Sequence, residues 1–230
     1  MQIGTNGPVL FGHGHKKNRP KWGKKKGSRN YMKNRRISGV SKETYKVYDE
    51  NGEFKRLIEK AEERTLTEKE WLKGVTCFVI NEKGEVLIEV RANKGLTPGK
   101  KDLCSGHLDD KETETQAMIR ELKEELGIGL EEAMNIIKVT PQGVPLGFES
   151  KGRIKKFFIT FYCLKRKTSK VEIQKEEIDK IVWLPLEEAC ALIKSGRTKF
   201  PKDYDYSKIF EKVKEIYYGE KDIQRGEQIW

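Results

Sequence analysis

Several features are scarce or missing in this chain of 230 residues, and each absence excludes a class of protein. No stretch approaches the roughly 20 consecutive apolar residues that a membrane-spanning helix needs. The first residues contain no apolar segment of the kind that a secretory signal carries, so we expect neither export nor a membrane partner. These absences favour a cytoplasmic protein.

Cysteine is also scarce, and none of the four cysteines belongs to a C-x-x-C pair. Such pairs are the usual sign of a structural zinc site or a redox motif. We therefore expect reduced thiols rather than a disulfide framework, as is normal for proteins of a reducing compartment. The four are Cys77, Cys104, Cys163 and Cys190.

Acidic residues are missing from residues 1–40, which hold 11 of the 47 basic residues and seven of the 21 glycines. The formal net charge is +11, so residues 41–230 are electrically balanced. A segment so basic and so poor in core-forming residues predicts a disordered tail. The tail could contact RNA phosphates or anionic lipid, or could serve only to keep the chain soluble.

From residue 41 onward the sequence is patterned, and we expect one domain over 41–230. Strand-like and helix-like patterns are interspersed, which predicts an α+β (mixed α/β) fold in which helices cover a mixed sheet. Strands are expected over 44–49, 74–80, 85–90, 156–164 and 181–184, and helices over 113–127, 186–195 and 206–218.

The helix expected over 113–127 carries three glutamates along one edge. At 100° per residue, Glu121, Glu124 and Glu125 share an arc of about 100°. Like charges this close repel one another on a helix, and a hard divalent cation such as Mg²⁺, or Mn²⁺ in its place, would offset that repulsion. Taken alone, however, the three residues are equally typical of an exposed glutamate-rich face.

The spacing around this helix favours the metal site over the exposed face. Residues 106–128 read G-x5-E-x7-R-E-L-x-E-E-x-G-I, and they match every specified position of the Nudix hydrolase signature. The chain therefore resembles the Nudix hydrolase family, and looser likenesses over most of residues 44–202 are to its isopentenyl-diphosphate isomerase-like branch. The fixed positions are Gly106, Glu112, Arg120, Glu121, Glu124, Glu125 and Gly127.

The resemblance implies a Nudix-type α/β/α sandwich that uses Mg²⁺ to hydrolyse a diphosphate bond. The substrate would be a nucleoside diphosphate derivative or a related organic diphosphate, and a glutamate would activate the attacking water. Glu121 could act as a metal ligand or as this base. Carried over by position, the metal ligands are Gly106, Glu121, Glu124 and Glu125, and the catalytic residues are Glu121, Arg120 and Glu112.

Substrate-binding residues are expected on two further segments. Arg91 and Lys94 follow the expected hairpin, where the isomerase-like branch places basic residues that bind diphosphate, although a solvent-exposed charge at a strand end is equally typical. Glu176 or Glu177 lies on a late loop where family members often add an acidic group.

The isomerase itself is an alternative function that the local sequence disfavours. That enzyme uses a cysteine directly before its Gly-His pair, whereas Ser105 precedes Gly106-His107 here and Cys104 stands one residue too early. It also uses upstream histidines for its metal, and residues 67–73 contain none. We therefore expect Cys104 to be a buried structural thiol.

A non-catalytic regulator that binds nucleotide or RNA is a second alternative. Loss of a signature glutamate is its usual mark, and none is lost here. A related possibility joins the two parts of the chain: the basic tail would hold an RNA 5′ end while the site removes its terminal diphosphate. Homodimers are common among relatives of this fold, so a homodimer is possible, and the sequence leaves the oligomeric state open.

Overall fold

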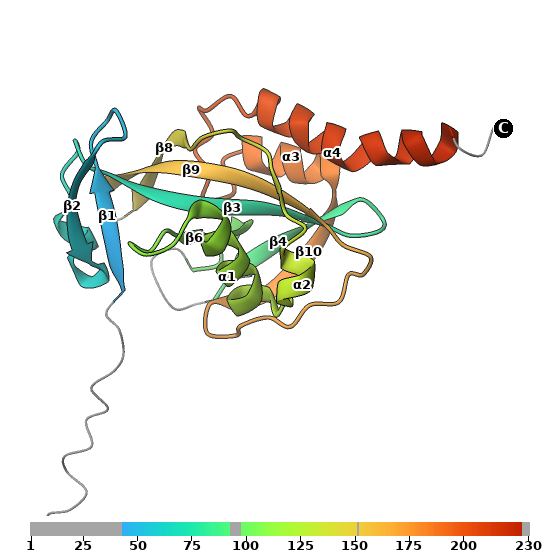
Figure 1. Cartoon of the computed structure of the whole chain (residues 1–230), viewed down its shortest axis with the longest axis horizontal. Coiled ribbons are helices and arrows are strands. Elements are labelled where there is room, and N and C mark those ends of the chain that lie inside the picture. Colours follow the sequence, from blue (N-terminus) through green and yellow to red (C-terminus); the bar gives the residue numbers. More distant parts are fainter. Residues whose placement is uncertain (1–42, 93–97, 151, 227–230) are drawn as a thin grey trace, which may run out of the picture. The chain divides into compact units, whose positions relative to one another are not determined.

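The structure, a computed structural model, describes residues 43–92, 98–150 and 152–226 (Figure 1). The expected tail over 1–40 and the candidate Lys94 lie outside the described residues, so the boundary at residue 41 stays a prediction. Within the described part of the chain, no helix combines the length and the apolar character needed to cross a bilayer.

The described part alternates strands with helices. The strands are β1 (Thr44–Tyr48), β2 (Phe54–Glu59), β3 (Trp71–Ile80), β4 (Glu85–Arg91), β5 (Lys101–Asp102), β6 (Cys104–His107), β7 (Ile137–Lys138), β8 (Val144–Ser150), β9 (Arg153–Lys165) and β10 (Ile178–Pro185). The helices are η1 (Lys60–Thr65, a 3-10 helix), α1 (Glu114–Leu126), α2 (Leu130–Ala133), α3 (Leu186–Lys194) and α4 (Ser207–Gly226).

The sheet is mixed and is built around β3. Strand β9 runs parallel to β3 over ten residue pairs, from Trp71↔Lys156 to Ile80↔Lys165. The other pairings are antiparallel, with β6 and β4 beside β3, β10 beside β4, and β8 beside β9. This arrangement confirms the mixed sheet expected from the sequence.

Side chains of β3 alternate between two buried cores, as the two-residue period of a strand requires. Val75, Cys77 and Val79 pack with α1 and α2, whereas Phe78 and Ile80 pack with α3 and α4. Figure 1 shows these two helix pairs on opposite sides of the sheet. The expected α/β/α sandwich is therefore confirmed.

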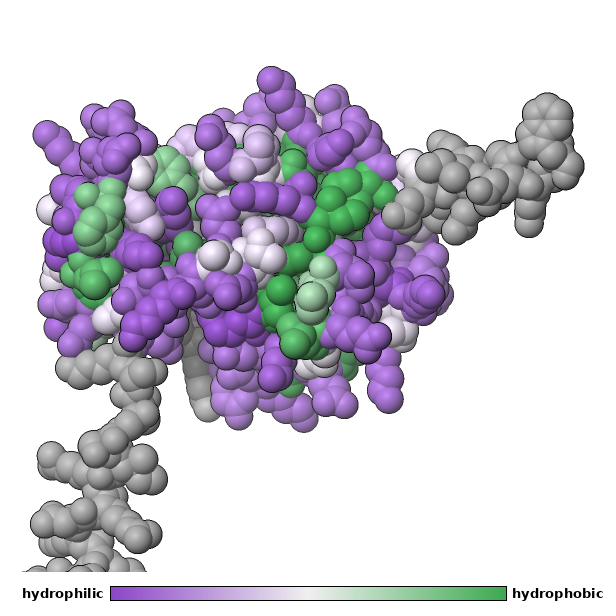
Figure 2. All heavy atoms as spheres, viewed as in Figure 1, coloured by the Kyte–Doolittle hydropathy of each residue, from purple (hydrophilic) through white to green (hydrophobic). Residues whose placement is uncertain are grey.

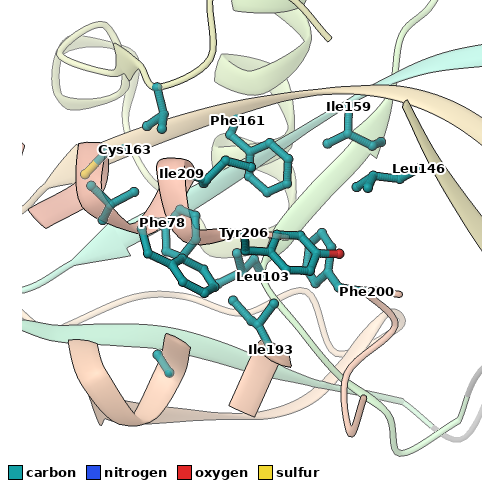
Figure 3. Close-up of a cluster of buried hydrophobic side chains, with 14 of the residues drawn as sticks. Phe78, Leu103, Leu146, Ile159, Phe161, Cys163, Ile193, Phe200, Tyr206 and Ile209 are labelled. Carbon is teal, nitrogen blue, oxygen red and sulfur yellow. The ribbon is translucent and has the colours of Figure 1, made fainter. Parts of the chain in front are cut away.

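The core on the α3 and α4 side is rich in aromatic rings (Figure 3). Phe161 lies 6.0 Å from Phe200 between ring centroids, and Phe78 meets Phe210 edge-on at 6.2 Å. The hydroxyl of Tyr206 donates a hydrogen bond to the Pro201 carbonyl at 3.0 Å, which fixes the approach to α4. The face drawn in Figure 2 is mostly hydrophilic, in keeping with a chain that is 36% charged.

Helix α1 forms where its end signals predict. Thr113 caps it by accepting the N–H of Gln116 at 3.3 Å, and Gly127 ends it with φ of 63°, a left-handed conformation that suits glycine. Leu122 and Leu126 are fully buried, as expected from the helical spacing. The helix therefore presents its carboxylate edge beside β6 in a fixed orientation.

Candidate active site

Arg120 is the centre of the hydrogen-bond network at the start of α1. Its Nε and Nη2 donate to the two oxygens of Glu112 at 3.1 and 2.8 Å, a bidentate pair. Its Nη1 donates to Glu121 at 2.7 Å and to Glu124 at 3.1 Å. Because Nη2 also donates to the His107 carbonyl at 3.0 Å, this one guanidinium links α1 to the strand and loop before it.

The three glutamates of α1 differ in burial along the shared edge. The side chain of Glu124 is 53% exposed, that of Glu121 is 12% exposed, and Glu125 is 4% exposed as a residue. Glu125 accepts the backbone N–H of Ser105 at 3.3 Å. The carboxylates thus form a series from solvent into the interior beneath β6.

Gly106 brings the backbone of β6 against this edge. A methyl group on Gly106 would overlap the carboxyl group of Glu121, so only glycine leaves room for that side chain. A methyl group on Gly74 would lie 3.1 Å from the Gly106 carbonyl oxygen, so that oxygen also has a glycine beside it. The expected glycine and glutamate ligands are therefore neighbours.

Burial and negative charge shape the acidity of these groups. Burial raises the pKa of Glu121 to about 7; Arg120 lowers it, and the charges of Glu124 and Glu177 raise it further. Burial also raises the pKa of Glu125 well above its ordinary value, and the charge of Glu121 adds to that effect. The site holds more negative charge than Arg120 balances.

Deeper in the interior, the acidic side chain of Glu89 lies close to that of Glu125. Glu89 on β4 is 1% exposed, and burial raises the pKa of its carboxyl well above the ordinary value. One ligand atom from each of Glu89, Cys104 and Glu125 lies within 4.8 Å of the other two. Cys104 is fully buried as expected, and neither it nor the other three cysteines, Cys77, Cys163 and Cys190, forms a disulfide within the described residues.

The residues that the sequence predicts to bind substrate do not all lie near the carboxylates of α1. Arg91 lies at the end of β4, with its Nη1 3.7 Å from Asp102, and Asp102 also binds Lys199 Nζ at 2.6 Å. Glu176 and Glu177 are exposed on the turn before β10, and the charge of Glu177 acts on Glu121 across the site. Arg91 is thus engaged with a buried carboxylate, while the charge of Glu177 acts on the α1 edge, the row formed by Glu121, Glu124 and Glu125.

His107 has a packing role that the sequence did not reveal. Its ring stacks on Tyr45 at 5.0 Å and meets the edge of Phe157 at 5.2 Å. Its Nε2 lies 3.4 Å from Glu63 on η1. The segment from β1 to η1 therefore supports the residue whose carbonyl Arg120 binds.

The donor set fits a hard divalent cation. Carboxylate and carbonyl oxygens are the ligands that Mg²⁺ prefers, and the α1 edge supplies several together with unbalanced negative charge. Arg120 holds two of these carboxylates by hydrogen bonds that leave further oxygen lone pairs free. The residues that would hold the ion are Gly106, Glu121, Glu124 and Glu125.

Comparisons with known proteins agree with this geometry. The isopentenyl-diphosphate Delta-isomerase of Corynebacterium diphtheriae is 31% identical over 111 residues, or 47% of this chain and 61% of that protein. The chain thus spans about three fifths of the length of this curated relative. The crystal structure of DR0079 from Deinococcus radiodurans has the same fold, with a TM-score of 0.52 and 23% identity over 74% of this chain and 99% of that one. The model of the NUDIX domain matches residues 71–204, more than half of the chain, and the chain therefore belongs to the NUDIX domain family.

Proposed function

We propose that this protein is a Mg²⁺-dependent hydrolase, with Mn²⁺ as a substitute ion, that cleaves a diphosphate bond. The substrate is a nucleoside diphosphate derivative or a related organic diphosphate. The observation that carries the proposal is the α1 edge itself: Glu121, Glu124 and Glu125 extend from solvent to the interior, with Arg120 bound to the first two.

The residues of the α1 edge have different proposed roles, which follow from how exposed each side chain is. A bound Mg²⁺ would neutralise diphosphate oxygens and lower the pKa of a bound water. Glu124, which is exposed, faces the side from which substrate arrives. Glu121 acts as a ligand or as the base, and its pKa of about 7 suits a group that accepts a proton near neutral pH. Arg120 and Glu112 position the edge.

Substrate contacts are proposed around the opening of the site. Lys60 on η1 and Glu177 before β10 interact electrostatically with each other, and the charges of both reach Glu121. We propose that the organic part of the substrate lies between η1 and the turn before β10. Arg91 and Lys94 would bind its phosphates, and Glu176 is a weaker candidate than Glu177.

Isomerisation of an isopentenyl diphosphate is the second candidate, because the Corynebacterium relative carries that name. Against it, Ser105 takes the position of the required cysteine, and Cys104 is completely buried in the core beneath α1. A regulator that binds nucleotide without turnover is a further alternative. RNA contact through the basic tail and a homodimer stay predictions.

The test is cleavage of a substrate panel with and without Mg²⁺, measured by chromatographic separation of the products, because hydrolysis of a linkage such as that in ADP-ribose yields two phosphomonoesters and no free phosphate. The panel holds nucleoside diphosphates, ADP-ribose, dinucleoside polyphosphates, triphosphate and capped RNA, and isoprenoid diphosphates. We expect Mg²⁺-dependent cleavage of one class of substrate and a loss of about 100-fold or more in Glu124→Gln. Glu131→Gln, an exposed glutamate on α2, is the matched control and keeps full activity.

Two outcomes would contradict the hydrolase. Conversion of isopentenyl diphosphate without phosphate release would establish the isomerase instead. Nucleotide binding without turnover on the entire panel, in the presence of Mg²⁺ or Mn²⁺, would favour the regulator.

A further inference from the structure

The group formed by Glu89, Cys104 and Glu125 lies deeper than the site described above. Each residue comes from a different element, namely β4, β6 and α1. All three are at least 96% buried, since their exposed fractions are 1%, 0% and 4%. One ligand atom from each residue lies within 4.8 Å of the other two, so the three donors converge on one place in the interior.

Glu89 carries an unusual feature for a buried carboxyl group. Its Oε1 is inaccessible to solvent and has no hydrogen-bond partner among the residues that the structure describes. Buried polar atoms are almost always paired, and an unpaired one costs about 1–3 kcal/mol. Something that accepts an oxygen lone pair is therefore expected at this position.

The nearby cations do not fill that role. Lys199 Nζ lies 2.6 Å from Asp102 and Arg91 Nη1 lies 3.7 Å from the same oxygen, so both side chains are engaged with Asp102. Asp102 is the cross-strand neighbour of Glu89 on the paired strands β4 and β5. Lys199 and Arg91 balance the charge of Asp102. The Cys104 thiol lies with the carboxyl groups of Glu89 and Glu125 between strand and helix, and Glu125 also accepts the Ser105 N–H.

We propose that Glu89, Cys104 and Glu125 bind a thiophilic divalent cation such as Zn²⁺. Two carboxylate oxygens and one sulfur match the ligands of Zn²⁺, whereas Mg²⁺ takes oxygen ligands alone. Binding requires Cys104 to lose its thiol proton and the carboxyl groups of Glu89 and Glu125 to be ionised, with the protons released to solvent, because thiolate and carboxylate are the ligands. Three protein ligands leave a fourth tetrahedral position open.

This site goes beyond the proposed hydrolase, because it selects a different ion and adds two residues, Glu89 and Cys104, that the family signature does not contain. Glu125 is the only residue that the two sites share. Glu124 belongs to the proposed Mg²⁺ site alone, and Glu89 and Cys104 belong to the zinc site alone. Variants at these positions therefore separate one proposal from the other.

The experiment titrates the full-length protein, stripped of metal by chelation, with Co²⁺ as a spectroscopic probe for Zn²⁺. We expect about one thiolate-bound Co²⁺ per chain, seen as thiolate-to-cobalt charge-transfer absorption that Zn²⁺ reverses. Cys104→Ala should abolish the absorption. Cys77→Ala is the matched control, because Cys77 is also fully buried and is the cross-strand neighbour of Cys104.

Two more variants keep the test decisive if Cys104→Ala does not fold. Glu89→Gln preserves shape and should weaken Co²⁺ binding at least about tenfold. Glu124→Gln should retain the absorption while losing hydrolysis, so failure of the hydrolase would not be confused with failure of the zinc site. The proposal is overturned if the wild type shows no charge-transfer absorption, if Cys77→Ala removes it, or if Glu89→Gln binds Co²⁺ as the wild type does.

Discussion

Among the single residues of the site, Gly106 is needed because it has no side chain, just as Glu121 is needed for the carboxyl group that it carries. Because Gly106 has only a hydrogen in place of a side chain, the Glu121 carboxyl group has room to lie against β6. The group in conflict with a methyl at this position is the end of a flexible side chain rather than backbone. A larger residue at position 106 would therefore displace the Glu121 carboxyl group without disrupting strand β6.

Gly106→Ala should thus separate activity from stability. We expect the free energy of unfolding to change by less than about 1 kcal/mol, because Glu121 can move aside. Cleavage of the substrate should fall about 100-fold, because the displaced carboxylate can no longer act in its place. Denaturant unfolding and turnover measured on the same preparation check both expectations.

Gly129→Ala is the matched control for this variant. Gly129 has φ of −64° and nothing within 4 Å of an added methyl group, so alanine fits there without strain. Both activity and stability should equal those of the wild type. A Gly106→Ala protein with wild-type turnover would show that the position of Glu121 does not matter for the reaction.

At the scale of elements, the sequence predicts what local signals determine. Helix α1 was predictable because its cap, its leucine spacing and its terminal glycine all agree. Strand β8 was missed because Pro145 and Gly147 indicate a turn. Among the strands that the structure describes, β8 pairs only with β9, and an edge strand tolerates proline. The short strands β5, β6 and β7 carry no periodic signal of their own.

The candidate site shows the same division between local and long-range information. The signature glutamates were found because they share one helix, whereas Glu89 comes from a distant strand that meets α1 only in the folded sheet. One signal was available: Glu89 interrupts the apolar run Val86–Val90, in the position that shares a face with the buried Leu87. A charge at a core position is a sign of a special role.

Glu70 illustrates how one buried carboxylate joins two elements. It lies directly before β3 and accepts hydrogen bonds from Arg56 of β2, at 3.0 and 3.3 Å, and from the Thr67 backbone N–H at 3.0 Å. The hydrogen bond from Arg56, followed by that from Thr67, lowers the pKa of Glu70 to about 2. Glu70 therefore stabilises the fold only while it is ionised.

The pH dependence of stability follows from the sign of this shift. The folded pKa lies below the unfolded value, so the stabilisation is complete above about pH 4.5 and is lost as the pH falls through about 2. Glu70→Gln should lower the free energy of unfolding at neutral pH by about 2 kcal/mol, discounted from the full shift because Arg56 is partly exposed. The difference from wild type should shrink as the solution is acidified.

Urea unfolding at a series of pH values from about 7 down to about 3 measures this prediction. The exposed Glu68→Gln serves as the control and should show no pH-dependent difference from the wild type. A Glu70→Gln deficit that stays constant over the whole series would mean that shape or packing, rather than charge, accounts for the loss.

At the scale of the whole molecule, charge is divided sharply along the chain. Residues 1–40 carry 11 basic residues and no acid, while the other 190 residues carry equal numbers of each. The proposed site requires nothing from the basic segment, because every residue assigned to it lies between Lys60 and Glu177. Catalysis and any attraction to polyanions should therefore be separable.

Deletion of residues 1–40 should consequently leave the turnover of a small diphosphate unchanged and weaken the binding of RNA. Each phosphate that lysine or arginine neutralises contributes about 0.7 to the slope of log affinity against log salt for a single strand, so the loss of several contacts should flatten this slope by several units. Fluorescence anisotropy with a short 5′-triphosphate RNA at several salt concentrations measures it. Replacing the 11 basic residues by glutamine in the full-length chain is the control that preserves length. If both variants bind RNA with the wild-type affinity and slope, the basic segment is not an RNA-binding arm, and the substrate of the site is to be sought among small diphosphates.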